Sequence, residues 1–169
     1  GFIIHLVADL VDEVYGVDIT EDMMKQIDLN RGKITLECAQ VEDLPFGGAE
    51  FDIVTAYSFM DHLLDYRLAL AEAYRVLKPG GVFFSGLNPN KRFSQMLQRI
   101  ESRVGDTELP LAVTREIKGM LHNGEYHNEM FGVSEESLTK AEPEKSLNGG
   151  FDSEEVLNSA KALGFTKVE

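Results

Sequence analysis

Cysteine and long apolar runs are both scarce in this sequence. Cys38 is the only cysteine, so an internal disulfide is excluded, and we expect a reducing compartment, the cytoplasm. No apolar run approaches the roughly 18–20 residues that cross a bilayer, so we expect no membrane span. The opening GFIIHLVADLV carries His5 and Asp9 and has no basic leader. It is therefore expected to form a buried helix and not a signal peptide.

Positive charge is scarce as well. The 169 residues include 29 acidic and 16 basic ones, which gives a formal net charge of −13. A surface that follows nucleic-acid phosphates needs clustered Lys and Arg, so no nucleic-acid partner is expected. The hydrophobic content of 43% and the charged content of 27% are ordinary for a globular protein. The length suits one domain over residues 1–169.

The first half of the chain alternates between helical and strand patterns. Strands are predicted at 13–19, 33–40, 51–58 and 81–87, and helices at 2–10, 21–29 and 65–77. Thr20 is the expected N-cap of the second helix. The third helix should bury four residues on one side: Leu70, Ala73, Tyr74 and Leu77. The alternation indicates an α/β protein with a mostly parallel sheet, and the apolar run FDIVTAYS suggests a strand covered on both faces.

The stretch RVLKPGGVFF joins a helix to a strand. Pro79 cannot continue the helix, and Gly80 and Gly81 can adopt positive φ without steric cost. We expect this corner to lead the chain directly from an outer helix into a buried strand.

Residues 88–150 follow a different pattern. Helices are predicted at about 90–103 and 111–122, and the polar stretch 132–150 shows no periodicity, so it could be a mobile loop or disordered. We interpret the whole segment as an insertion or lid. In the last part, Asp152 or Ser153 should cap a helix that ends at Gly164, followed by a strand over FTKV.

Several of these pieces together resemble a known family. EVYGVDIT, CAQVEDLPF, FDIVTAYSFMDHLLDYRLALAEAYRVLKPGGV and LGFTKVE resemble class I S-adenosylmethionine-dependent methyltransferases, especially the small-molecule group of ubiquinone and menaquinone biosynthesis. The resemblance covers about residues 1–87 and 151–169. It implies a Rossmann-like fold, with a mostly parallel sheet, helices on both faces and a helical or loop insertion before the last strands.

The family's first motif is a strand followed by a D-x-G-x-G-x-G turn. Gly1 matches the last glycine of that turn, and the interval from Gly1 to Asp18 matches the spacing to the acid that ends the family's second strand. The resemblance therefore implies that the first strand, the earlier glycines and a final antiparallel strand lie outside the sequence given.

The resemblance also implies a set of cofactor-binding residues. Asp18 would accept hydrogen bonds from the ribose hydroxyls, as an acid at the carboxyl end of such a strand can. Its alternative role is a capping or loop acid. Gly1 would let the backbone approach the cofactor, or would simply begin a helix. Ile19 would press on the adenine face, with core packing as its alternative.

Two further positions follow the next two strands. Gln40 would accept from the adenine amino group through its amide oxygen, while the backbone of Val41 and Glu42 meets the ring. Glu42 and Asp43 are alternatives for the Gln40 role. Tyr57 would lie beside the methionine end of the cofactor, or would instead cover the core.

Histidines are the remaining candidates for chemistry. His62 could deprotonate a substrate, since an imidazole exchanges a proton near neutral pH, or could be a hydrogen-bonded structural residue. In HNGEYHNE, the spacing of His122 and His127 is not the one-face H-x3-H spacing of helical metal sites, and Gly124 makes a regular helix doubtful. We expect no metal.

The function expected from the resemblance is methyl transfer from S-adenosylmethionine to a small-molecule acceptor. No obligatory catalytic side chain is required, because the sulfonium already activates the methyl group and the protein mainly aligns the reactants and excludes water. Two alternatives remain open: an NAD-type oxidoreductase, which shares the strand-end acid, and a non-catalytic cofactor-binding or scaffold domain. The expected partner is the acceptor itself, and a homodimer is allowed for.

Overall fold

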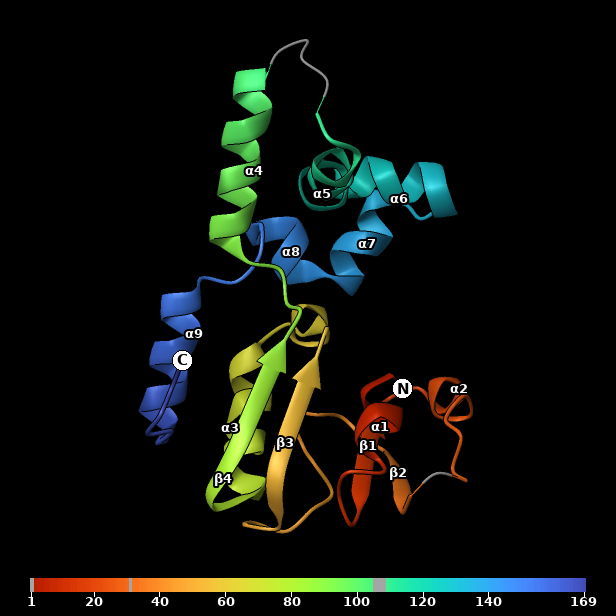
Figure 1. Ribbon diagram of the computed structural model, residues 1–169, viewed down its shortest axis with the longest axis vertical. Coiled ribbons are helices and arrows are strands. Elements are labelled where there is room, and N and C mark those ends of the chain that lie inside the picture. The colour runs from red at the N-terminus through yellow and green to blue at the C-terminus, as the bar shows by residue number, and fades with distance from the viewer. Residues whose placement is uncertain (1, 31, 105–108) are drawn as a thin grey trace. The chain divides into compact units, whose positions relative to one another are not determined.

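The computed structural model describes residues 2–30, 32–104 and 109–169 (Figure 1). The chain divides into two compact units. The strands over residues 51–57 and 77–86 each begin in the first unit and end in the second. Unit 1 comprises residues 1–54 and 67–83, and unit 2 comprises residues 55–66 and 84–169.

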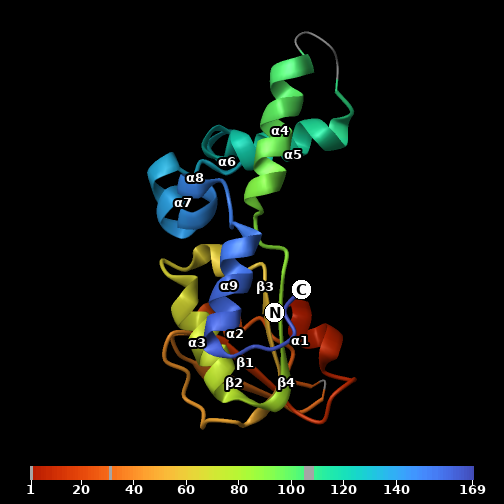
Figure 2. The same ribbon diagram turned by 90° about the vertical axis from the view of Figure 1, so that its left-hand side faces the viewer.

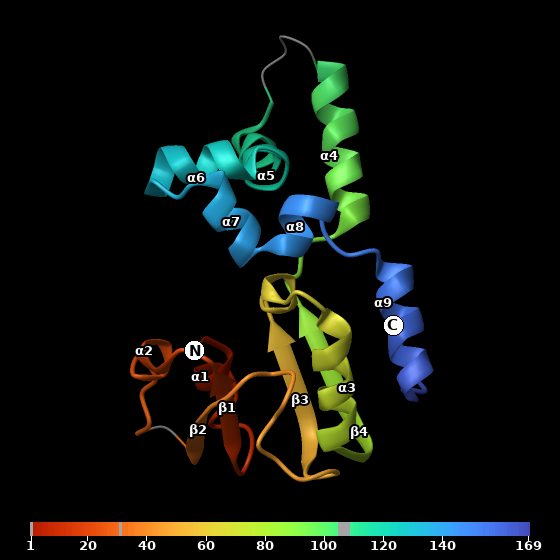
Figure 3. The same cartoon turned by 180° about the vertical axis from the view of Figure 1, so that it is seen from behind.

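A parallel strand pair forms the first part of unit 1. β1 (Val14–Asp18) pairs with β2 (Ile34–Cys38) in a register that sets Asp18 opposite Cys38. The helices α1 (Phe2–Val7) and α2 (Glu21–Met24) contact β1 (Figure 3). A Cβ at Gly16 would lie 2.6 Å from Ile4 Cδ1. A glycine in the middle of β1 therefore lets α1 pack directly on the strand.

A second parallel pair follows. β3 (Phe51–Tyr57) neighbours β4 (Leu77–Gly86), and their arrows point the same way in Figure 1. Glu50 N donates to Val76 O and Ser58 N to Gly86 O, both at 2.8 Å, at the two ends of the pair. α3 (Tyr66–Val76) runs along one face of this pair (Figures 1 and 3). The parallel strands confirm the expected Rossmann-like α/β class.

The corner between α3 and β4 differs in detail from the prediction. β4 begins at Leu77, directly after the helix, and includes the Pro-Gly-Gly sequence. Gly80 has φ of +84°, but a positive φ is absent at Gly81. A Cβ at Gly81 would lie 2.9 Å from Lys78 O and 3.0 Å from Asp52 O. Glycine is needed at position 81 because the neighbouring backbone passes so close, and not because of its φ.

Only one face of the second strand pair is covered among the described residues of unit 1. Ile53 and Val82, on β3 and β4, are 56% and 57% exposed. The expectation that this strand is covered on both faces is therefore wrong for the part of the chain that the structure describes. An apolar run distinguishes a strand from a loop, but it does not reveal what packs against each face.

Five helices form the middle of unit 2 (Figure 2). They are α4 (Lys91–Val104), α5 (Leu111–Leu121), α6 (Asn123–Phe131), α7 (Glu135–Ala141) and α8 (Pro143–Asn148). Each contacts the next along the chain, and α8 contacts the short 3-10 helix η1 (Met60–His62). The two long predicted helices are confirmed as α4 and α5.

Helices α6 to α8 correct two expectations. Gly124 lies inside regular helix α6, where a Cβ would meet Glu135 Cγ at 3.1 Å. The glycine thus allows α6 and α7 to approach, which offsets its low helix propensity. The polar stretch 132–150 is mostly helical: Ser134 caps α7 by accepting from Ser137 N, and Gly149 ends α8 with φ of +69°.

Helix α9 (Ser153–Leu163) follows the prediction closely. The Asp152 side chain accepts hydrogen bonds from Glu154 N and Glu155 N, and Gly164 ends the helix with φ of +115°. The predicted strand over FTKV is wrong, since residues 165–168 adopt no strand. An extended segment becomes a strand only by hydrogen bonding to a neighbour, and a four-residue pattern does not establish that neighbour.

Two smaller predictions also fail. α2 ends at Met24, far short of residue 29, and the Thr20 side chain makes no capping hydrogen bond. Tyr74 is exposed, whereas Leu70, Ala73 and Leu77 are buried as expected.

Within the described ranges, no helix has the length and apolarity that crossing a membrane requires.

Candidate functional site

The carboxyl ends of β1 and β2 bring the first predicted residues together in unit 1. Asp18 is the last residue of β1, and its backbone oxygen accepts from Ala39 N at 3.2 Å. The loops after the two strands therefore start side by side. The Asp18 carboxylate accepts from Thr20 N through Oδ1 at 2.8 Å, which fixes the carboxylate at the start of its loop.

The neighbouring side chains offer polar and apolar surface. Ile19 is 70% exposed, so it is not the core residue of the alternative interpretation. Gln40 is exposed directly beyond β2, and Asp43 N donates to Gln40 O at 3.2 Å to close a turn. Val41 and Glu42, inside that turn, are half-buried. Gly1 lies outside the described residues.

These groups fit a nucleoside in chemical terms. A carboxylate accepts through two oxygens, so Asp18 can bind hydroxyl groups in addition to Thr20 N. An exposed aliphatic side chain beside it suits the flat face of a base, and the Gln40 amide can both donate and accept. Ligands of open α/β sheets bind at the carboxyl ends of the strands, which is where these residues lie.

The loop after β2 is held in place by side chains of α3. Arg75 donates to Phe46 O at 2.8 Å and to Leu44 O at 3.0 Å, and Glu72 accepts from Leu44 N at 2.8 Å. The hydrogen bond from Arg75 and that from Leu44 N hold the pKa of Glu72 below its ordinary value, against the opposing effect of burial.

Rings of Tyr15, Phe46 and Phe51 complete the support of this loop. Their centroids lie 4.9–5.6 Å apart in edge-to-face arrangements. The contacts join β1, the loop and β3 within unit 1. The LPF segment therefore has a structural role in unit 1.

In unit 2, Tyr57 and His62 lie at and just beyond the carboxyl end of β3. Tyr57 is half-buried, and His62 is exposed at the end of η1. His62 Nδ1 lies 2.8 Å from Ala141 O. A carbonyl oxygen can only accept, so Nδ1 carries a proton, and in the neutral ring Nε2 is left as the acceptor. An imidazole that accepts a proton at Nε2 must be in this tautomer.

A polar network beside η1 was missed by the sequence reasoning. Asn88 Oδ1 accepts from Met60 N at 3.1 Å, and Asn88 Nδ2 donates to Ser85 Oγ at 2.7 Å. Ser85 Oγ in turn donates to Ala56 O at 3.1 Å. The available signal was the change from an apolar strand to small polar residues in SGLNPN.

The histidines of the helical segment point to separate partners. His122 Nε2 lies 2.6 Å from Glu101 Oε1, and His127 Nδ1 lies 3.0 Å from Asn123 O. No cluster of three or more His, Cys, Asp or Glu able to hold a metal ion occurs in the residues that the structure describes.

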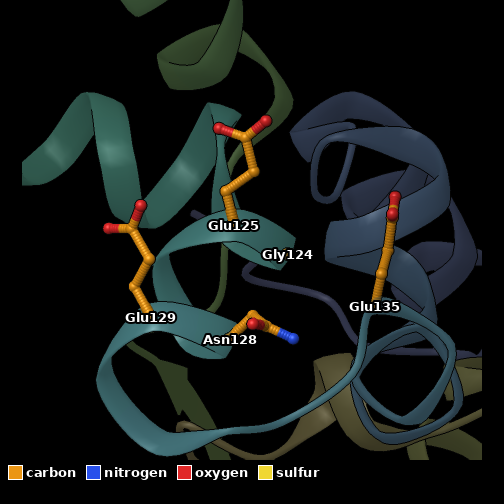
Figure 4. A pocket seen from close by; sticks show the side chains of 5 residues that line it. All are labelled: Gly124, Glu125, Asn128, Glu129 and Glu135. Carbon is orange, nitrogen blue, oxygen red and sulfur yellow. The ribbon is translucent and has the colours of Figure 1, made fainter.

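A cavity of about 320 Å³ lies between α6 and α7. It is lined by Gly124, Glu125, Asn128, Glu129 and Glu135, and its three carboxylates project to the same side (Figure 4). Three of its five lining residues are glutamates, and none of the residues predicted from the sequence to bind cofactor contributes to it.

The predicted residues thus form two groups, each within one unit. Asp18, Ile19 and Gln40 lie together at the edge of the first strand pair, with the Val41–Glu42 turn beside them. Tyr57 and His62 belong to unit 2.

Comparison with known proteins places this geometry in context. The family model described as "Methyltransferase domain" matches residues 1–85. A probable S-adenosylmethionine-dependent methyltransferase of Mycolicibacterium smegmatis is 30% identical over 91 residues, which cover 54% of this chain and 35% of that protein. The demethylmenaquinone methyltransferase of Staphylococcus carnosus is 42% identical over 73 residues, which cover 41% of this chain and 30% of that protein.

A solved structure shows the same fold over nearly the whole chain. The SAM-dependent methyltransferase structure from Thermotoga maritima gives a TM-score of 0.54 at 17% identity and covers 95% of this chain and 58% of that one. The matched segments span about a third of the length of these curated relatives.

Proposed function

The chain belongs to the methyltransferase-domain family, and we propose that the protein transfers a methyl group from S-adenosylmethionine to a small-molecule acceptor. The observation that carries this proposal is the edge of the first strand pair, where the Asp18 carboxylate, the exposed Ile19 side chain and the Gln40 amide lie together. In the proposal Asp18 binds the ribose hydroxyls, Ile19 contacts the adenine face, and Gln40 with the Val41–Glu42 turn meets the adenine edge.

S-adenosylmethionine supplies an electrophilic methyl group, whose carbon passes to the acceptor nucleophile while the sulfur keeps the bonding electron pair. Where that nucleophile carries a proton, His62 is the proposed residue to accept it, because the Ala141 carbonyl leaves Nε2 free of a proton in the neutral ring. Tyr57 is proposed to contact the methionine end of the cofactor.

The proposed acceptor is a reduced quinone ring or a similar aromatic compound. One relative is named for demethylmenaquinone, and the family resemblance of the sequence favours the same small-molecule group. The single cysteine supports action in the cytoplasm.

Calorimetric titration of the full-length protein tests the cofactor. S-adenosylmethionine and its demethylated product, S-adenosylhomocysteine, should both bind, and NAD should not. Binding of NAD alone would contradict the proposal in favour of an oxidoreductase, and binding of none of the three would favour a scaffold role.

Methyl transfer itself is tested with 1,4-dihydroxynaphthalene, kept reduced, as a surrogate acceptor. Mass spectrometry should detect the singly methylated product together with S-adenosylhomocysteine. His62→Gln should lower kcat while leaving S-adenosylmethionine affinity unchanged. An unchanged kcat in a folded variant would remove His62 from the reaction.

A further inference from the structure

The turn at residues 40–43, which carries the proposed adenine-binding groups, depends on its two ends for its position. Asp43 N donates to Gln40 O at 3.2 Å, which closes the turn on itself. In the part of the chain that the structure describes, no hydrogen bond joins residues 40–43 to another helix or strand. The position of the turn is therefore set largely by the residues that precede and follow it.

The two ends of the turn are anchored to different elements. On one side, Ala39 N donates to Asp18 O at 3.2 Å, which ties the start of the turn to the end of β1. On the other side, Leu44 N donates to Glu72 Oε2 at 2.8 Å, and Leu44 O accepts from Arg75 Nη2 at 3.0 Å. Both backbone groups of Leu44 thus bond to side chains of α3, a helix that is distant in the sequence.

Arg75 and Glu72 hold each other in one geometry. The Arg75 Nε and Nη2 atoms donate to the two oxygens of the Glu72 carboxylate, both at 2.7 Å, and Nη1 donates to Phe46 O at 2.8 Å. The planar fork of an arginine suits such a two-point contact, and a lysine has no such fork. The pKa of Arg75 is raised, chiefly by the hydrogen bond to Glu72 and also by the charge of Asp43, the last residue of the turn.

The hydrogen bonds of this pair join the two side chains to each other and to the segment 44–46, so the pair acts on a ligand only through that segment. We propose that Arg75 and Glu72 are positioning residues for adenine recognition. By fixing the segment 44–46, they hold the turn at 40–43 in place beside the adenine edge. This inference rests on the proposed cofactor site and adds residues that do not themselves touch the cofactor.

The sugar of the cofactor should be independent of the pair. Asp18 is the last residue of β1, and its carboxylate accepts from Thr20 N at 2.8 Å. Neither feature involves α3. Loss of the Arg75–Glu72 pair should therefore weaken binding of the base and leave binding of the sugar unchanged.

The test compares the affinity of the full-length protein for two ligands. S-adenosylhomocysteine carries the base, whereas S-ribosylhomocysteine carries the ribose and the amino acid without it. Arg75→Met removes the donors and keeps an apolar side chain. It should weaken S-adenosylhomocysteine binding about 5- to 30-fold, the range for losing one or two hydrogen bonds to the base, and leave S-ribosylhomocysteine binding unchanged. Calorimetry measures the first ligand, and ligand-observed NMR measures the second, which binds more weakly.

Two conservative variants make the test independent of one substitution. Arg75→Lys keeps the charge but has no planar fork, so its affinity for S-adenosylhomocysteine should lie between those of Arg75→Met and the wild type. Glu72→Gln keeps an oxygen that can accept from Leu44 N and should also have an intermediate affinity. Circular dichroism checks that each variant is folded at the assay temperature.

Lys78→Met is the matched control. Lys78 pairs with Asp52 at 2.8 Å in the same unit, and the two side chains make no hydrogen bond to the segment 44–46 among the described residues. Loss of this ion pair should leave the affinity for both ligands unchanged.

An equal loss of affinity for both ligands in a folded Arg75→Met protein would overturn the positioning role, because general damage acts on both. An unchanged affinity for S-adenosylhomocysteine in Arg75→Met, together with a weakened one in Asp18→Ala, would overturn this inference alone. A wild-type protein that does not bind S-adenosylhomocysteine would overturn the proposed cofactor site, and the inference with it.

Discussion

Two aspartates, Asp18 at the end of β1 and Asp61 in η1, differ in what surrounds their carboxylates. Asp18 is half-exposed and accepts from Thr20 N, so a ligand that binds it displaces water from an accessible group. Asp61 is buried, and its Oδ1 has no hydrogen-bond partner in the part of the chain that the structure describes. The accessible carboxylate of Asp18 is the one that suits a polar sugar.

Replacement of Asp18 should weaken the binding of S-adenosylhomocysteine. We expect Asp18→Ala to cost about 1–3 kcal/mol of binding free energy, the range for hydrogen bonds to a charged group. Asp18→Asn keeps an oxygen that can accept from Thr20 N but removes the charge. Comparing the two variants therefore separates the effect of the loop's conformation from the effect of the charge. Calorimetry is the measurement, with the exposed Asp22→Asn as a control that should bind normally. Unchanged affinity in a folded Asp18→Ala protein would place the cofactor elsewhere.

Glu72 should stabilise the fold in a pH-dependent way. Its folded-state pKa is lowered, chiefly by the hydrogen bond from Arg75, so the stabilisation is present above the ordinary pKa of 4.5 and is lost as the pH falls through the lower folded-state pKa. Glu72→Gln should therefore lower the free energy of unfolding by about 1–2 kcal/mol at pH 7. The deficit should be smaller at about pH 3, because the stabilisation is lost as the pH falls through the lowered folded-state pKa of Glu72.

Urea denaturation at the two pH values measures this difference. The exposed Asp12→Asn serves as the matched control and should change stability little at either pH. A deficit of equal size at both pH values would show that the Glu72 charge does not contribute.

At the scale of elements, glycines in neighbouring helices have different surroundings. A Cβ at Gly119, in α5, would meet no atom within 4 Å, whereas a Cβ at Gly124, in α6, would lie 3.1 Å from Glu135 Cγ. The first glycine therefore only lowers helix propensity, and the second also makes room for α7. The same residue type has two roles that sequence position alone does not separate.

Gly119→Ala should stabilise the protein, because alanine favours the helix by about 0.8–1 kcal/mol over glycine and meets no steric obstacle. Gly124→Ala should gain clearly less, or lose stability, because Glu135 must move. Thermal and urea unfolding of both variants beside the wild type measures the difference. Equal gains would contradict the close approach of α6 and α7.

At the scale of the whole molecule, the charge of −13 is the dominant feature. Like charges repel one another in the compact state, and salt screens that repulsion. The few exposed ion pairs add little, since such pairs contribute about 0–1 kcal/mol each. Electrostatics should therefore oppose folding of the 169-residue chain at low ionic strength and neutral pH.

Raising NaCl from about 10 mM to about 200 mM at pH 7 should raise the unfolding midpoint by roughly 1–4 °C, which corresponds to about 0.5–1 kcal/mol. Near the isoelectric point of about 4.7 the net charge vanishes, and the salt effect should largely disappear. Scanning calorimetry at both pH values is the measurement. A midpoint that falls with salt at pH 7 would show that attractive ion pairs outweigh the repulsion.

How much of the fold could be predicted depends on how local its causes are. The Asp152 cap, the Gly164 stop and the strand that ends in Asp18 were predictable because each is set by residues within one or two turns of the chain. The helix over 123–131 was not, because the reason for Gly124 is Glu135 in the next helix. The absent FTKV strand has the same explanation, since a strand depends on its neighbour.

The same distinction between local causes and contacts of distant segments applies to the candidate site. The sequence by itself determined the family, the α/β class and the residues at the strand ends, because periodicity, caps and ordered motifs are properties of neighbouring positions. Only the tertiary structure decided that Ile19 is exposed, that Ala141 sets the His62 tautomer and that Asp61 is buried, with no partner for its Oδ1 among the described residues. Burial and hydrogen bonding between distant segments depend on how the chain packs, and no local pattern encodes them.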